Sequence, residues 1–170
     1  MSYLTCYGRV NVDLSPLIQR VHSLPSDAWV SRGDPESYKT SAVRQGDKHW
    51  ASVAKEIDQL LEATFEYFEP GYFNRVVLSK IPAGEKILPH TDDFGDAIRK
   101  ISTHCHIPLI THPDVKMGFT ENRIEHHLKA GYLYTMDETV YHYVNNDSDI
   151  DRVHLLFAHF PHSGIKTKEK

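Results

Sequence analysis

The stretch NRVVLSKIPAGEKILPH, residues 74–90, decides the fold class of this sequence. It contains two short runs rich in β-branched and apolar residues, which flank the turn signal PAG. Similar runs continue to the C-terminus: THCHIPLIT (103–111), VKMGFT (115–120), RIEHHLK (123–129), GYLYTMD (131–137), VYHYVNN (140–146) and RVHLLFAHF (152–160). About eight closely spaced strands predict a mainly β fold, a two-sheet jelly roll (double-stranded β-helix, cupin-like). An α+β fold with one larger antiparallel sheet is the competing architecture.

Helices are expected before the strands. Between Trp50 and Phe68 apolar residues recur at three-and-four spacing, which predicts an amphipathic helix. A shorter helix is expected over residues 16–24, whereas residues 29–49 show no clear period. We therefore predict a single domain, residues 1–170. In it a helical and irregular part (1–72) packs on a jelly-roll core (73–162), and a polar tail (163–170) is frayed.

Composition limits the class of function. The formal net charge of −4, with acids and bases interspersed, gives no strong signal for nucleic-acid binding. Two cysteines without CxxC spacing argue against a disulfide framework. The N-terminus lacks the pattern of a secretory signal, and no apolar run is long enough to span a bilayer. A cytoplasmic protein is the simplest interpretation.

The chemistry centres on LPHTDDFGD, residues 88–96. In an extended chain, His90 and Asp92 project to the same side, whereas Asp93 projects away. Alone, this is more typical of a polar turn than of a metal site. The chain, however, has twelve histidines, and VYHYVNN supplies His142 as a further ligand. Two histidines and one carboxylate with open positions are typical of non-haem Fe(II) oxygenases.

An iron site whose co-substrate is a dicarboxylate also needs a rigid cation, and an arginine follows ten residues after His142. Arg152 opens the next predicted strand, beyond the turn NNDSD. Its planar guanidinium is suited to bidentate binding of a carboxylate. If the two strands form an antiparallel hairpin, His142 and Arg152 point into one cavity at different depths.

HTD, then YH, then DRVHL resemble the aspartyl/asparaginyl β-hydroxylase family of Fe(II)/2-oxoglutarate-dependent oxygenases, which includes bacterial free-proline hydroxylases. The resemblance covers roughly residues 74–160. It implies that His90, Asp92 and His142 bind Fe(II), and that Arg152 pairs with the distal carboxylate of 2-oxoglutarate. Animal peptide-hydroxylating members lack the acid of the HxD pair, so Asp92 makes this chain more similar to the bacterial small-molecule enzymes.

The resemblance also implies further contacts to 2-oxoglutarate. Ser79 matches the serine that many members place on the strand before the first ligand. His106 matches the histidine of an Arg-x-His motif beside the ketone. His104 stands where that motif has arginine, and either His104 or the nearby Arg99 is expected to take its place.

The leading hypothesis is therefore a hydroxylase that uses Fe(II) and 2-oxoglutarate and releases succinate and CO2. Its substrate would be a free amino acid, a small carboxylate or a peptidyl Asp/Asn side chain. The first alternative is a cupin-type metalloenzyme that uses His104 and His106. The glutamate usual after a cupin His-x-His is missing, which disfavours it. The second alternative is a non-catalytic jelly-roll binding module.

Overall fold

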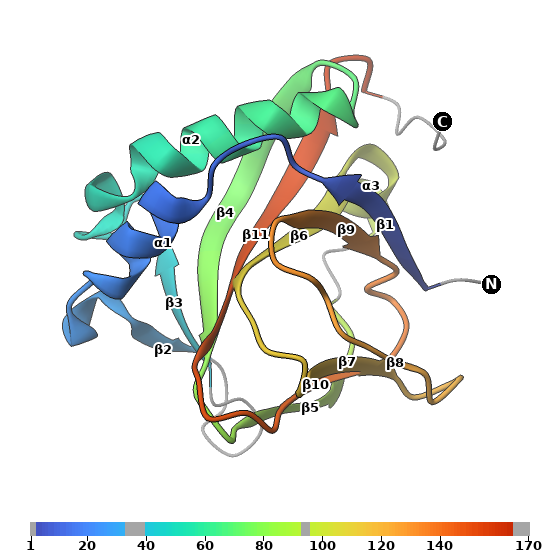
Figure 1. Ribbon diagram of the computed structural model, residues 1–170. Coiled ribbons are helices and arrows are strands. Elements are labelled where there is room, and N and C mark those ends of the chain that lie inside the picture. Colours follow the sequence, from blue (N-terminus) through green and yellow to red (C-terminus); the bar gives the residue numbers. More distant parts are fainter. Residues whose placement is uncertain (1–2, 33–39, 93–95, 165–170) are drawn as a thin grey trace.

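The computed structural model describes residues 3–32, 40–92 and 96–164, except for the side chains of residues 32, 96 and 99. Two antiparallel sheets face each other (Figure 1). The larger has the strand order β1-β9-β6-β11-β4-β3-β2, and the smaller has the order β5-β10-β7-β8. The strands are β1 (Leu4–Arg9), β2 (Val30–Arg32), β3 (Thr40–Arg44), β4 (Gly71–Ile81), β5 (Lys86–His90), β6 (Thr103–Ile110), β7 (Val115–Phe119), β8 (Glu125–His126), β9 (Tyr132–Met136), β10 (His142–Asn146) and β11 (Arg152–Pro161).

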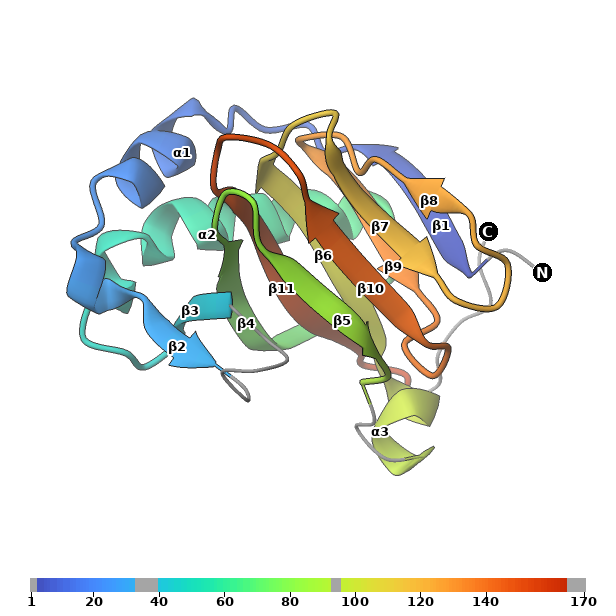
Figure 2. The same ribbon diagram turned by 90° about the horizontal axis from the view of Figure 1, so that it is seen from below.

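Two helices, α1 (Ser15–His22) and α2 (Ala54–Ala63), cover the outer face of the large sheet (Figure 2). Pro16 starts α1 with a preset backbone angle. The apolar face of each helix meets every second residue of the central strands, and together they form the main core. Its central members are Leu17, Val21, Ile57, Leu60, Leu78, Ile107, Val153 and Leu155. The single helix expected from Trp50 to Phe68 is instead α2, flanked by the 3-10 turns η2 (Trp50–Ser52) and η3 (Thr64–Glu66).

A second, smaller core lies between the two sheets. It contains Ile81, Val115, Met117, Leu128, Tyr134 and Val144. This double-sheet arrangement confirms the jelly roll, and all eight predicted strands form within a few residues of their expected positions. Neither β1 nor the short helix α3 (Asp96–Ile101) is expected from the sequence, and residues 29–49, which show no clear period, contain β2 and β3. The segment LTCYGR has no period-two alternation and owes its strand conformation to pairing with β9.

The chain crosses from one sheet to the other between β10 and β11, at residues 147–151. Because β10 lies in the small sheet and β11 in the large one, the expected hairpin between them is wrong. Asn146, fully buried, holds this crossing. Its Nδ2 donates to the carbonyls of Ile81, Pro82 and Ile150 at 3.1, 2.9 and 2.9 Å. The two strands that carry His142 and Arg152 therefore face each other across the interior.

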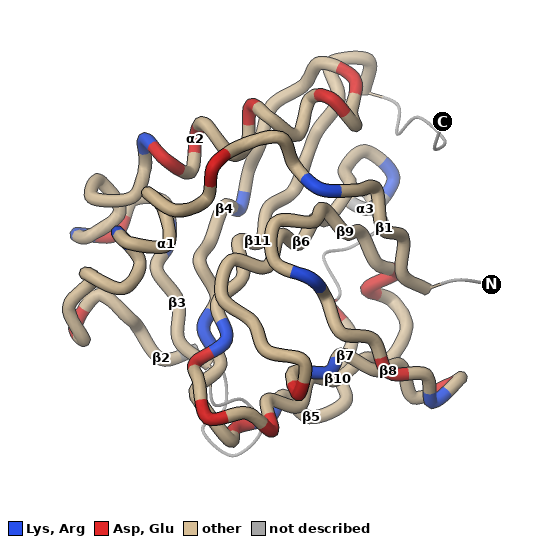
Figure 3. Tube along the Cα trace, in the orientation of Figure 1, with Lys and Arg blue, Asp and Glu red and all other residues tan. Residues whose placement is uncertain are grey.

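Charged residues of both signs are interspersed along the chain, as Figure 3 shows. Within the described residues, no helix is long and apolar enough to cross a membrane.

Candidate metal centre and adjoining cavities

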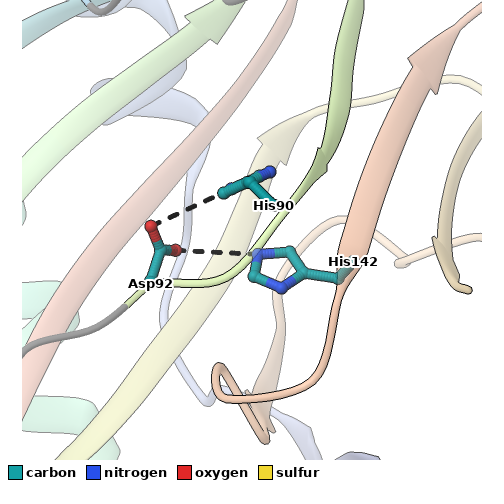
Figure 4. A group of neighbouring side chains, drawn as sticks. All are labelled: His90, Asp92 and His142. Carbon is teal, nitrogen blue, oxygen red and sulfur yellow. Dashed lines mark ion pairs between the residues drawn. The ribbon is translucent and has the colours of Figure 1, made fainter.

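His90 and His142 lie side by side on neighbouring strands of the small sheet. They are paired residues in the register of β5 and β10, and their ring centroids are 4.3 Å apart. Asp92 follows β5 directly, and its N–H donates to the Glu138 carbonyl at 3.0 Å. This bond directs the carboxylate toward both imidazoles (Figure 4).

The ligand atoms of these three side chains all lie within 4.8 Å of one another. The Asp92 carboxylate oxygens are 3.9 Å from His90 Nε2 and 3.6 Å from His142 Nε2. Each imidazole donates its Nδ1–H to a carbonyl two residues earlier, that of Leu88 at 2.8 Å and that of Val140 at 3.0 Å. A hydrogen bond of this kind fixes the ring and directs Nε2 toward the position of a metal ion. Nowhere else in the described chain do three His, Cys, Asp or Glu side chains converge in this way.

The charges of this group favour a bound cation. Burial would raise the pKa of Asp92, but the hydrogen bond to His142 and the charge of His90 outweigh it, so the pKa is lowered. Burial would likewise lower the pKa of His142, but the Asp92 carboxylate and the Val140 carbonyl raise it. For His90 burial dominates, and its pKa is lowered. An ionised carboxylate beside two half-buried or buried imidazoles suits a divalent transition metal.

A cavity of about 260 Å³ runs from this group to the large sheet. His90, Asp92 and His142 line one end, and Ser79, Thr40 and Arg152 line it from β4, β3 and β11. Arg152 and His142 therefore share a cavity as expected, although they approach it from opposite sheets. Thr40 has no motif around it, and only the pairing of β3 with β4 brings it here.

Arg152 is an unusual buried cation. It is 3% exposed, and its Nη2 donates to His154 Nδ1 at 2.6 Å. Its Nε has no hydrogen-bond partner, and no carboxylate lies within ion-pair distance among the described residues. Burial lowers the pKa of this guanidinium to about 9. A buried charge without a counter-ion is costly, so the site is suited to an anionic ligand.

His104 and His106 take different positions on β6. His106 lines the 260 Å³ cavity, and its buried Nδ1 has no partner among the described residues. Burial, together with the charge of Arg152, lowers the pKa of His106 to about 3, so its ring is neutral. His104 instead contacts Glu138 Oε2 through Nδ1 at 3.0 Å, and Ser102 Oγ through Nε2 at 3.3 Å.

Both nitrogens of His104 are therefore engaged, which argues against the cupin alternative. Arg99 lies in α3, but its side chain is outside the described part of the structure.

A larger cavity, of about 540 Å³, adjoins the first and is lined by His104, Glu138, Arg44 and Arg75 among others. Glu138 was not anticipated, because it lies in a loop without a recognisable motif.

The sequence of this chain matches a known family over the segment that contains the site residues. Residues 51–161 match the family described as aspartyl/asparaginyl beta-hydroxylase. The chain belongs to this family. The matched segment includes α2, and it contains His90, Asp92, His142 and Arg152. No curated protein sequence matches the chain.

Several solved structures share the fold of this β-hydroxylase family member. A prolyl-4-hydroxylase from Pseudomonas putida has a TM-score of 0.60 at 14% identity, covering 94% of this chain and 92% of its own. The viral collagen prolyl hydroxylase of Paramecium bursaria Chlorella virus-1, in its 2-oxoglutarate complex, has a TM-score of 0.58 at 11% identity, covering 94% and 97%. HygX from Streptomyces hygroscopicus, with nickel, 2-oxoglutarate and hygromycin B bound, has a TM-score of 0.59 at 13% identity, covering 95% and 84%.

Proposed function

We propose that this protein is an Fe(II)- and 2-oxoglutarate-dependent dioxygenase that hydroxylates an unactivated C–H bond and releases succinate and CO2. The observation that carries this proposal is the shared 260 Å³ cavity. A His-Asp-His group lies at one end, and at the other lies a buried arginine that has no carboxylate partner within the described part of the chain. Family membership and the solved structures support the same activity.

The residues present fit the metal ion. His90 and His142 offer their Nε2 atoms, and Asp92 offers a carboxylate oxygen, which leaves positions for other ligands. When bound, Fe(II) would supply the oxygen activation that no amino-acid side chain can perform. The protein's own part is to fix the ligands, which the Leu88 and Val140 carbonyls do by orienting both rings.

Arg152 and Ser79 would hold the distal carboxylate of 2-oxoglutarate. The guanidinium donates two parallel hydrogen bonds to such a group, and the hydroxyl of Ser79 lines the same cavity. His154 Nδ1 accepts a hydrogen bond from Arg152 Nη2 and so fixes the guanidinium. The remaining N–H groups of the guanidinium are directed away from His154. His106 is neutral, and its Nδ1 has no hydrogen-bond partner in the described ranges, so it would contact the other end of the co-substrate.

The substrate is proposed to be a free amino acid or another small carboxylate. Asp92 supports this, since it is the acid that animal peptide-hydroxylating members lack. A peptidyl Asp or Asn side chain is the second candidate, favoured by the family description. The enzyme is proposed to act in the cytoplasm, which is consistent with the absence of disulfides among the described residues.

The test is conversion of 2-oxoglutarate to succinate with Fe(II), ascorbate and oxygen. Wild type should form succinate only when Fe(II) is present. His142→Ala should abolish it, whereas His22→Ala, which changes an exposed histidine on α1, should not. Succinate formation that persists without His142 would overturn the proposal.

A further inference from the structure

A small cavity of about 10 Å³ lies next to Arg152 and is distinct from the cavity proposed for 2-oxoglutarate. Arg152 lines both cavities, whereas Thr111 and His154 line only the small one. Most of the other residues around the small cavity are apolar and buried, namely Val115, Met117, Leu128 and Val144. A cavity of this volume accommodates about one water molecule and is too small for an organic ligand.

The hydrogen bond between Arg152 and His154 determines the tautomer of this histidine. A guanidinium has only donors, so His154 Nδ1, which lies 2.6 Å from Arg152 Nη2, is the acceptor and carries no proton. Burial, together with the charge of Arg152, lowers the pKa of His154 well below its usual value, so the ring is neutral. A neutral imidazole without a proton on Nδ1 carries it on Nε2. His154 therefore has one N–H donor on the nitrogen that does not contact Arg152.

Two polar groups at this cavity have no protein partner within the described residues. They are His154 Nε2 and Thr111 Oγ1, and both atoms are buried. Thr111 follows β6 directly, and the antiparallel pairing of Ile110 with Val153 brings it beside Arg152. A buried donor or acceptor without a partner is destabilising, and ordered water is the usual partner where protein groups are missing.

We infer that the 10 Å³ cavity is a site for one buried water molecule, which accepts the Nε2–H of His154 and donates to Thr111 Oγ1. Arg152 Nε, for which the described ranges also contain no partner, offers this water a further donor. A buried water typically makes two to four hydrogen bonds to such groups and is costly to remove.

The water site makes His154 and Thr111 positioning residues for the co-substrate. Neither lines the cavity proposed for 2-oxoglutarate, but together they hold the guanidinium that does. The expected effect on co-substrate binding rests on the proposed oxygenase function. The water site itself requires neither the metal ion nor 2-oxoglutarate, so the two are tested separately.

Nuclear magnetic resonance of the metal-free full chain, with isotope-labelled histidine, tests the water site. We expect His154 to have an unprotonated Nδ1 and a protonated Nε2. Its Nε2–H should give a rotating-frame Overhauser cross-peak to water, and the sign of this peak distinguishes a bound water from proton exchange. The spectrum of His154→Gln, which lacks the ring, identifies the signal. A proton on Nδ1, or an Nε2–H without the water cross-peak, would overturn the inference.

Calorimetric titration of 2-oxoglutarate into the Mn(II)-loaded protein tests the positioning role. Thr111→Val keeps the shape of the side chain but removes its hydroxyl, so Kd should rise about fivefold, the loss of one hydrogen bond. Thr111→Ser should restore the wild-type Kd. Thr120→Val, which changes an exposed threonine directly after β7, is the matched control and should bind like wild type. Mn(II) affinity should be unchanged in all three variants, which shows that they are folded.

A double-mutant cycle separates a shared water from two independent effects. His154→Phe removes the Nε2–H that the water accepts, so adding Thr111→Val to this variant should change Kd by less than about twofold. An equal loss of affinity in both backgrounds would show that the two residues are not linked and would overturn the inference. If wild type binds Mn(II) but not 2-oxoglutarate, the proposed function fails, whereas the spectrum of the metal-free chain still decides the water site.

Discussion

Replacing Arg152 by methionine should have opposite effects on co-substrate binding and on the stability of the metal-free protein. In the free protein the guanidinium is 3% exposed, and His154 Nδ1 is its only hydrogen-bond partner among the described residues. Methionine fills a similar volume without a charge. The change therefore removes the proposed anchor for 2-oxoglutarate and, at the same time, a buried cation to which the described residues offer no counter-ion.

The structure sets both magnitudes. Burial lowers the pKa of Arg152 to about 9, well below the ordinary range of a guanidinium, which corresponds to a cost on the order of 5 kcal/mol for holding the charge. Loss of the hydrogen bond to His154 costs about 1–3 kcal/mol in the opposite direction. The metal-free variant should thus unfold at the same or a higher temperature than wild type. Loss of a buried charge pair in the complex costs about 3–5 kcal/mol, a rise in Kd of roughly two to three and a half orders of magnitude.

The assay is calorimetric titration of 2-oxoglutarate into the Mn(II)-loaded protein, with thermal unfolding of the metal-free form in parallel. Arg9→Met, which changes an exposed residue of β1, is the control and should bind 2-oxoglutarate like wild type. A variant at residue 152 that binds 2-oxoglutarate as tightly as wild type would refute the assigned role. A variant that loses affinity only because it no longer folds would refute the stability reasoning.

Three further predictions follow from individual contacts. Asn146→Ala should lower the free energy of unfolding by about 3 kcal/mol in urea denaturation, because three carbonyl groups at the sheet crossing lose their donor; a loss below 1 kcal/mol would contradict this. Ser79→Ala should weaken 2-oxoglutarate binding roughly fivefold to tenfold in calorimetry without changing Mn(II) affinity, and an equal loss of both would point to misfolding. His106 has a folded pKa of about 3 against 6.5, so the unfolded chain takes up a proton first as pH falls, and stability decreases by about 1.4 kcal/mol per pH unit between pH 6.5 and about 3. In His106→Asn this slope should be shallower by that amount in metal-free protein, and an unchanged slope would show that another group titrates.

The sequence predicted those parts of the molecule in which local pattern and tertiary structure agree. The eight strands from residue 74 onward carry their own turn signals and apolar runs, so these local features are sufficient to predict their positions. The spacing of His90 and Asp92 likewise predicts that their side chains lie on the same side, because residues two apart in an extended chain face the same way. His142 and Arg152 were paired correctly as neighbours of one cavity.

Other parts depend on contacts that no local pattern records. The crossing at Asn146 sends β10 and β11 to different sheets, so the expected hairpin is wrong although the shared cavity is real. Glu138 lies in a loop, and only the fold brings it to His104 and the main chain of Asp92. The strained backbone of Arg75 follows from a register shift between two long strands, which the sequence does not show.

Binding of Mn(II), measured by electron paramagnetic resonance of the free ion, tests the central claim most directly. Wild type should bind one ion per chain, and alanine at residue 90, 92 or 142 should weaken binding by more than roughly 100-fold. His104→Ala should bind Mn(II) like wild type, because both nitrogens of that ring are engaged elsewhere. Retained binding in His142→Ala, or lost binding in His104→Ala, would contradict the assignment of the metal centre.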